Sequence, residues 1–413
     1  MSQDIEKLVY QVVFEKDAKA NKTIRKIAKE KGVIIQSSQK LYQARAKGEW
    51  QGFTVPAINI RTLTFDVAKV IFREALKKKA GALIIELARS EISYTSQAMS
   101  EFVPVILAAA ITEGYKGPVF VQADHFQIKA KKYFDPDKKE EEISSLKDLI
   151  KDSIKAGVYN IDIDASTLVR LESPDLKEQQ KYNSLLTAEL TSYIRSLQPK
   201  GMTLAVGGEV GEVGKKNSSP EEVKVFMEEY NKNLAKLGVK PGLIKLSVQT
   251  GATHGGIVLP SGKIKKVEID FDTLKKLSKE ARRYGLAGAV QHGASTLPEE
   301  YFDEFPKSEA VEIHLATAFQ NIIYDHMPEP LVEKLYNWLR KEKADERKPE
   351  QTEEQFLYTT RKRALGPFKK EIWDMPKANK DKAVQALEDK FSLLFDKLKI
   401  SNTSELISKL YKS

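Results

Sequence analysis

Residues 119–124 read VFVQAD and are followed directly by His125. The run is mostly apolar, which is typical of a strand in a parallel sheet, because such strands are covered on both faces. An acid and a histidine come at the point where this strand would end. An apolar run that ends in polar side chains is the pattern that decides the fold, because the chain repeats it.

Seven further runs of the same kind are spread over the middle of the chain. The segments between them carry apolar residues at helical spacing, most clearly at 66–79, 97–113, 144–156 and 271–284. Eight strand–helix units predict an α/β fold, a (β/α)8 TIM barrel, which commonly takes about 250 residues. The seven runs are VPAINI (55–60), ALIIEL (82–87), YNIDID (159–164), LAVGGE (204–209), LIKLSV (243–248), GAVQHG (288–293) and EIHLAT (312–317).

The residues on either side of the barrel predict helical additions. We expect a helical N-terminal extension at residues 1–52, the catalytic barrel at 53–328 and a helical C-terminal extension at 329–413. Within the first, residues 22–44 place a glycine between two amphipathic halves and so resemble a DNA-binding helix-turn-helix. A basic helical arm that packs on the barrel or on a neighbouring subunit is the more common interpretation.

The composition restricts the chemistry of any site. The 413 residues include five histidines and no cysteine, so disulfides and thiolate metal sites are excluded, and a metal must be held by His, Asp or Glu. We find no stretch of about 18 apolar residues and no secretory signal, so we expect a soluble cytoplasmic protein without a membrane partner. The net charge of +9 is spread along the chain and favours anionic ligands only weakly.

Polar residues gather at the predicted C-terminal ends of the strands, where barrel enzymes carry their chemistry. Three histidines would follow the third, sixth and seventh strands and could converge on one rim: His125, His254 and His292. Three imidazoles leave a fourth position on Zn²⁺ open for water or substrate. Taken singly, each histidine is more often structural, so the metal hypothesis depends on this convergence. The other polar residues at or near strand ends are Asn59, Glu86, Asp124, Asp162, Asp164, Glu209 and His314.

Glycines flank two of these histidines, in GATHGG (251–256) and HGAS (292–295). They remove side chains where a ligand could approach, and their backbone N–H groups could hold a phosphate. The alternative interpretation is that they end strands and begin tight turns. Both remain open at this point.

Six segments in the right order resemble the class II, metal-dependent fructose-bisphosphate aldolases between about Val55 and Gln320. AIN is similar to the family's AFN or AVN, and ADH resembles its LDH. VGGEVGEVG resembles VEAELGxIG, while GATHGG and VQHGAST resemble GxxHG and LHGGSG. IHLATAFQ corresponds to INVxTEFQ.

This resemblance implies a set of roles at the matching positions. His125, His254 and His292 would bind a catalytic Zn²⁺ or another divalent metal, with Glu209 as an alternative ligand or local anion, and a monovalent cation is a further possible cofactor. Asp124 would be the acid/base at the C4 hydroxyl of a ketose, and Glu212 could replace the family's acidic loop residues. The residues expected to bind the phosphate and sugar are Asn59, Gly255, Gly293, Ser295, His314 and Thr317.

Four positions depart from the family pattern near the sugar: Ala88, Asn217, His314 and Ala316. They suggest an altered ketose more than a loss of chemistry. The leading hypothesis is a zinc-dependent lyase that cleaves a ketose bisphosphate, most simply fructose 1,6-bisphosphate, to dihydroxyacetone phosphate and an aldehyde such as glyceraldehyde 3-phosphate.

Two alternatives are kept beside this hypothesis. The first is a metal-dependent ketose or keto-acid epimerase or a non-catalytic aldolase-like subunit, and the second is a nucleic-acid-binding protein. The expected partner is a small phosphorylated sugar rather than a nucleic acid. The long helical additions favour a homo-oligomer, a dimer or a multiple of dimers.

Overall fold

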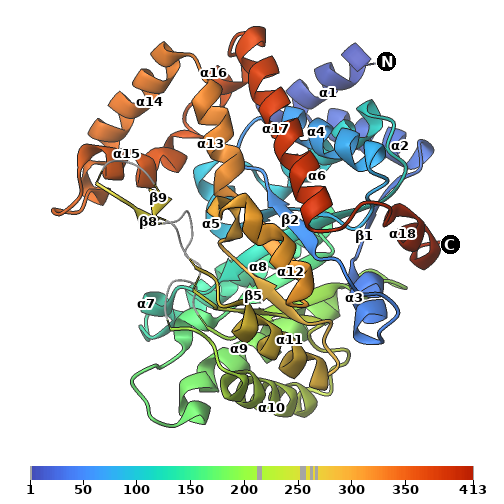
Figure 1. Cartoon of the computed structure of the whole chain (residues 1–413), viewed down its shortest axis with the longest axis vertical. Coiled ribbons are helices and arrows are strands. Elements are labelled where there is room, and N and C mark those ends of the chain that lie inside the picture. Colours follow the sequence, from blue (N-terminus) through green and yellow to red (C-terminus); the bar gives the residue numbers. More distant parts are fainter. Residues whose placement is uncertain (1, 212–215, 252–256, 261–263, 266–267, 413) are drawn as a thin grey trace.

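The computed structural model of the chain describes residues 2–211, 216–251, 257–260, 264–265 and 268–412 (Figure 1). Three residues with expected roles lie outside the described part of the chain: Glu212, His254 and Gly255. Among the described helices, none combines the length and the apolarity needed to cross a membrane.

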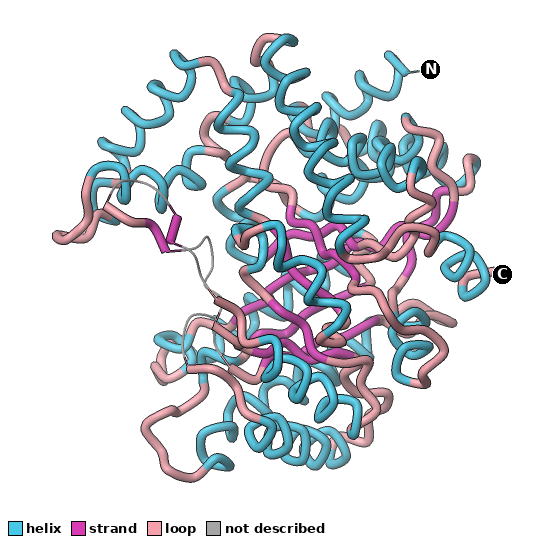
Figure 2. The backbone as a smooth tube through the Cα atoms, in the orientation of Figure 1, coloured by secondary structure: helices cyan, strands magenta, loops and turns pink. Residues whose placement is uncertain are grey.

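Eight parallel strands form a closed barrel in the centre of the molecule (Figure 2). Each strand pairs with its neighbours in the chain, the last pairs with the first, and β4 pairs with both β3 and β5. The predicted (β/α)8 barrel is therefore confirmed, and every predicted apolar run overlaps one barrel strand. The strands are β2 (Val55–Asn59), β3 (Ile84–Ala88), β4 (Gly117–Gln127), β5 (Asn160–Asp164), β6 (Ala205–Glu209), β7 (Lys245–Val248), β10 (Ala289–Gln291) and β11 (Glu312–Leu315).

Helices surround the barrel and begin and end where the sequence carries caps. In α10, the Ser219 side chain accepts a hydrogen bond from the backbone of Glu222, whose own side chain accepts from the backbone of Ser219. Gly157 ends α8 with a φ of 95°, a conformation that glycine adopts without strain. The helices between the strands are α4 (Thr64–Lys77), α5 (Arg89–Tyr94), α6 (Met99–Thr112), α7 (Ala130–Tyr133), α8 (Lys139–Ala156), α9 (Leu176–Leu197), α10 (Pro220–Lys236), α11 (Phe271–Arg283) and α12 (Glu304–Lys307).

The N-terminal extension contains a strand that the helical expectation missed. It consists of α1 (Ser2–Phe14), α2 (Ala18–Glu30), β1 (Val33–Gln36) and α3 (Gln39–Ala46). β1 pairs in parallel with the first residues of β4, which is longer than the other barrel strands. Gly32 ends α2 with a φ of 76°, and the β-branched residues of VIIQ then favour a strand. The helix-turn-helix interpretation is wrong, because a strand separates the two helices.

The C-terminal residues wrap back over the barrel and meet its first helix. They form α13 (Thr317–His326), α14 (Glu329–Glu342), α15 (Glu353–Thr360), α16 (Lys369–Trp373), α17 (Lys377–Lys397) and α18 (Ser404–Leu410). α17 packs on α4 and on α13, where the rings of Phe391 and Phe319 have centroids 4.7 Å apart (Figure 1). Both extensions contribute to the same hydrophobic core as the barrel, and the three-part division at residues 52 and 328 stays a proposal.

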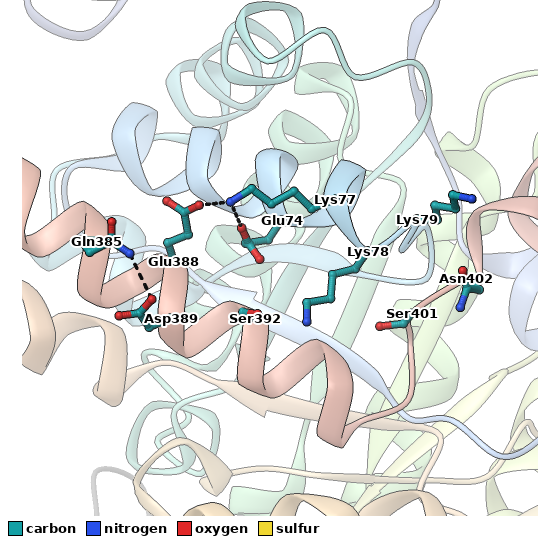
Figure 3. Close-up of a pocket in the computed structure, with 10 residues that line it drawn as sticks. All are labelled: Glu74, Lys77, Lys78, Lys79, Gln385, Glu388, Asp389, Ser392, Ser401 and Asn402. Carbon is teal, nitrogen blue, oxygen red and sulfur yellow. Dashed lines mark hydrogen bonds and ion pairs between the residues drawn. The ribbon is translucent and has the colours of Figure 1, made fainter.

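A polar cavity of about 610 Å³ lies between α4 and α17 (Figure 3). Within it, Lys77 contacts both Glu74 and Glu388. Its lysines are surface residues, so we attribute this cavity to the packing of the two helices.

A short antiparallel hairpin follows the sixth barrel strand. It pairs β8 (Ile257–Val258) with β9 (Ile264–Lys265). Gln355 of α15 donates a hydrogen bond of 2.8 Å to the backbone oxygen of Val258. The hairpin is therefore anchored to the C-terminal extension, away from the barrel wall (Figure 1).

Candidate active site

A cavity of about 560 Å³ opens at the C-terminal ends of the barrel strands. Its lining comes from the ends of β2, β3, β4, β10 and β11, from α5, and from Lys362 and Arg363 of the C-terminal extension. Of the expected site residues, those that line it are Asn59, Asp124, His125, His292, Gly293, Ser295, His314 and Thr317.

Asp124 and His125 both face this cavity because β4 is irregular at this point. In a regular strand, neighbouring side chains point to opposite faces of the sheet. Here the register of β4 against β5 shifts between Ala123 and Phe126, and His125 has a φ of 39°. Such a conformation costs a non-glycine residue of order 1–3 kcal/mol and is concentrated at functional sites. The bulge thus turns the acid and the histidine toward the same space.

The Asp124 carboxylate is buried and held from two sides. The Asn59 amide donates a hydrogen bond of 3.1 Å to its Oδ2, and Nδ1 of His314 lies 3.1 Å from its Oδ1. Burial alone would raise the pKa of Asp124, but the charges of His125, His314 and His292 lower it well below its usual value. Asp124 is therefore ionised, which is the form that accepts a proton.

The His125 ring is oriented by acids on its far side. Its Nδ1 lies 2.9 Å from Asp164 Oδ2 and 3.2 Å from Glu209 Oε2, at the ends of β5 and β6. Histidines that bind metals usually donate their other ring N–H to a carboxylate in this way. Burial and the charge of Asp164 raise the pKa of Glu209 to about 7, although His125 opposes this shift. Glu209 thus lies beside His125, and its role as a metal ligand or local anion stays a prediction.

His292 completes the described donor set. Its Nε2 lies 3.0 Å from the Ser247 hydroxyl, and its ring centroid is 4.1 Å from that of His125. Asp124, His125 and His292 can each offer one ligand atom, and these atoms lie within 4.8 Å of one another. Imidazole nitrogens are ligands that Zn²⁺ accepts, so His125 and His292 fit a divalent metal, with the Asp124 carboxylate close to it.

Three of the phosphate-binding residues expected from the sequence are described by the structure, and they lie together near the start of α13. Thr317 is the first residue of this helix, and the Ser295 hydroxyl accepts a hydrogen bond of 3.4 Å from the backbone N–H of Ala318. Gly293 has a φ of 71° at the neighbouring turn, a conformation that favours glycine. The amino end of a helix attracts anions, so this arrangement suits a phosphate.

Two cationic side chains that line the cavity were not predicted. Nη1 of Arg61 donates a hydrogen bond of 3.3 Å to the Thr317 hydroxyl, and its Nε pairs with Glu91 at 2.7 Å. The Lys362 ammonium lies 5.8 Å from the ring centre of Tyr94. Burial and the nearby charges of Arg61 and Arg363 lower the pKa of Lys362 to about 8.

The sequence held a signal for only one of these cations. Arg61 follows the first predicted strand closely, just after Asn59, and its position at a strand end could have identified it. Lys362 lies 45 positions after Thr317, in a helical segment with no recognisable motif. Only the folded C-terminal extension brings it to the cavity.

The positions that depart from the expected pattern differ in their surroundings. Ala88 and Ala316 line the cavity with methyl groups, whereas Asn217 is exposed and is not among the lining residues. His314 lines the cavity but is almost fully buried, and carboxylates face both of its ring nitrogens. Its expected contact with the sugar is not tested by these distances.

Comparison with known proteins gives a family match and a fold match. The family model described as "Fructose-bisphosphate aldolase class-II" matches residues 37–373. The sequence has no significant match among curated proteins. The fold resembles the fructose-bisphosphate aldolase of Campylobacter jejuni, with 16% identity, a TM-score of 0.53, and coverage of 89% of this chain and 96% of that chain.

A second solved structure of similar fold is the fructuronate-tagaturonate epimerase UxaE of Cohnella laeviribosi. It shares 12% identity with a TM-score of 0.59, and the match covers 84% of this chain and 81% of that chain. At such low identities, both likenesses support the barrel fold alone.

Proposed function

The chain belongs to the class II fructose-bisphosphate aldolase family, and on this premise we propose that it cleaves a ketose bisphosphate reversibly. The most direct substrate is fructose 1,6-bisphosphate, which would give dihydroxyacetone phosphate and glyceraldehyde 3-phosphate. The observation that carries the proposal is the set of side chains that line one cavity. It combines an ionised acid, two oriented histidines and a cationic end suited to phosphate.

Asp124 has the position and charge for the proton transfer. Cleavage of the C3–C4 bond turns the C4 hydroxyl into an aldehyde, so a base must take the hydroxyl proton. The electron pair of the broken bond stays with the C1–C3 fragment, which then takes a proton from water at C3 to become dihydroxyacetone phosphate. In the reverse direction C3 loses this proton, and Asp124 returns a proton to the C4 oxygen. The Asn59 amide holds the carboxylate toward the cavity for both directions.

His125 and His292, with His254 expected from the sequence, are the residues that would hold the metal, and Glu209 lies beside His125. When bound there, Zn²⁺ or another divalent metal would supply a Lewis acid for the ketose carbonyl. The identity of the metal and any monovalent cation are parts of the proposal.

Cationic side chains from several elements line the cavity and favour a substrate with two anionic groups. Arg61 follows β2 and donates a hydrogen bond to Thr317, which begins the helix after β11, and Lys362 of the C-terminal extension lines the same cavity. Arg89 and Lys129 line the cavity where β3 and β4 end. We therefore assign the C1 phosphate to the Thr317 end and expect the second phosphate at the other.

Epimerisation of a phosphorylated ketose is the second candidate function. It is favoured by Ala88 and Ala316, which place methyl groups where polar contacts to the sugar would be expected. An epimerase would yield an isomer, whereas the proposed aldolase yields two fragments.

The test is to incubate the metal-loaded protein with a panel of ketose phosphates and identify the products by mass and NMR. Triose phosphates support the aldolase, and an unfragmented isomer supports the epimerase. Asp124→Asn is the matched control for contaminating activity, because it changes one atom of the acid. Turnover that survives this substitution undiminished would reject the assigned role of Asp124.

Two further expectations remain proposals. One is the homo-oligomer, a dimer or a multiple of dimers, which light scattering of the purified protein would test. The other is a cytoplasmic location, which cell fractionation would test.

A further inference from the structure

His314 is surrounded by carboxylates on both edges of its ring. Its Nδ1 lies 3.1 Å from Asp124 Oδ1 and 3.0 Å from Glu86 Oε1, and its Nε2 lies 2.6 Å from Glu312 Oε1. These distances are those of hydrogen bonds, and an ionised carboxylate can only accept, so a ring N–H is the donor wherever the facing acid is ionised. His314 therefore connects the acid of the cavity with an acid deeper in the barrel.

Glu312 is fixed in turn by the barrel interior. The Lys245 ammonium donates a hydrogen bond of 2.5 Å and the Gln122 amide one of 3.0 Å to its Oε1, and the Tyr42 hydroxyl donates to its Oε2. All of these side chains are fully buried or nearly so. Glu312 has little freedom to move, so it is a fixed support for His314.

This ionic layer lies where barrels usually carry branched apolar side chains. Lys245 also donates a hydrogen bond of 2.9 Å to Asp162, so that two carboxylates share one buried cation. Burying ion pairs costs desolvation energy that apolar residues of similar volume would not cost. A gain in stability is therefore a weak explanation for this layer. Its contact with the cavity, through His314, suggests a functional role instead.

We propose that His314 is a positioning residue that holds the Asp124 carboxylate in place for proton transfer, with Glu312 and Lys245 as its support. The proposal rests on the function proposed above, because it takes the role of Asp124 from there. It assigns to His314 a task different from binding the sugar. A sugar hydroxyl could use the ring nitrogens only by displacing the carboxylates that already face them.

Two substitutions of His314 separate the contribution of its Nδ1 from that of its Nε2. The amide nitrogen of asparagine lies about where Nδ1 of histidine lies, so His314→Asn keeps a donor for Asp124. The amide nitrogen of glutamine lies about where Nε2 lies, so His314→Gln keeps the donor to Glu312 and loses the one to Asp124. His326 lies outside the cavity, and His326→Gln is the matched control.

We expect His314→Gln to lower kcat for cleavage about 10- to 100-fold, the usual cost of losing a residue that orients a reacting group. KM and metal content should stay near their wild-type values, and His314→Asn should recover part of the lost kcat. Exchange of the C3 hydrogens of dihydroxyacetone phosphate with solvent involves no C4 hydroxyl, so it should continue in both variants. Wild-type kcat in His314→Gln, or an equal loss of cleavage and exchange, would overturn the proposal.

A second measurement detects the hydrogen bonds of the His314 ring directly and does not depend on enzyme activity. In protein labelled with ¹⁵N at histidine, Asp124→Asn should shift the Nδ1 signal of His314, and Glu312→Gln should shift its Nε2 signal. Absence of both shifts would overturn the positioning role. Both shifts could occur in a wild-type protein that neither cleaves ketose phosphates nor exchanges the C3 hydrogens of dihydroxyacetone phosphate. In that case the proposed function fails, but the hydrogen bonds from His314 to Asp124 and Glu312 are confirmed.

Discussion

At the scale of single residues, the strand-end histidines carry the metal hypothesis. His292 has its Nε2 beside Ser247, so its Nδ1 is the nitrogen that would face a metal. We expect His292→Ala to lose bound metal and turnover together, measured by elemental analysis and a coupled assay. Chelation of the wild type should have the same effect, and added Zn²⁺ should restore activity. His326→Ala is the control, and a His292→Ala protein that keeps metal and activity would reject the site.

Asp124 separates the proton-transfer role from the metal role. Asp124→Ala should retain metal but lose roughly 100-fold or more in kcat, the scale of removing a general acid/base. The measurement pairs the elemental analysis with steady-state kinetics. Loss of the folded state, seen by circular dichroism, would instead mark Asp124 as a structural carboxylate.

Lys362 should make the binding of a phosphorylated substrate depend on pH. Its pKa is lowered to about 8 by burial and by Arg61 and Arg363, while Glu91 and Glu346 act in the opposite direction. The ammonium form that attracts phosphate is present below this pKa and is lost above it. KM for a phosphorylated substrate should therefore rise as the pH passes through about 8.

The control for this dependence is a cation that does not titrate in this range. Lys362→Arg should remove the rise in KM, because arginine stays charged. Lys362→Met should weaken binding about tenfold or more at pH 7, since a hydrogen bond to a charged group contributes about 1.5–3 kcal/mol. An unchanged KM profile in both variants would exclude Lys362 from the phosphate site.

At the residue scale, the sequence could predict placement where a strand end fixes the position of a side chain, while the roles of these side chains stay predictions. Asp124, His125 and His292 follow apolar runs, and barrel closure brings them together. The direction of the His314 ring could not be predicted, because it depends on buried partners such as Glu312 and Lys245. The sequence showed Lys245 only as one polar residue within an apolar run.

At the scale of elements, the C-terminal helix α17 is part of the barrel's outer layer. Phe391 is fully buried and contacts Phe319 of α13. Phe391→Ala should lower the free energy of unfolding by about 3–5 kcal/mol, the usual cost of truncating a buried aromatic side chain. Phe134, which is 44% exposed, provides the control, since Phe134→Ala should cost far less. Equal effects in denaturant titrations would show that α17 does not pack as described.

The elements differ in how far the sequence could predict them. The eight barrel strands were found because each is a near-continuous apolar run bounded by helical spacing. β1 was missed because Val33–Gln36 is short and lies between two basic helices. Its partner is β4, more than eighty positions away, and no local pattern shows such a pairing.

At the scale of the whole molecule, the barrel and the C-terminal extension build one site. The strand ends provide the acid and the histidines, and the extension adds Lys362 and Arg363 to the cavity. The barrel and its family could be predicted from motifs in sequence order. The cationic end could not, because it exists only once the extension has folded over the barrel.

The central claim is that this cavity breaks a carbon–carbon bond of a ketose bisphosphate. The most direct measurement is NMR of fructose 1,6-bisphosphate labelled with ¹³C at C3 and C4, incubated with the metal-loaded protein. We predict that the one-bond coupling between these carbons disappears as two free triose phosphates form, and that a chelator prevents the change. A coupling that persists while the substrate stays intact or becomes an isomer would contradict the claim.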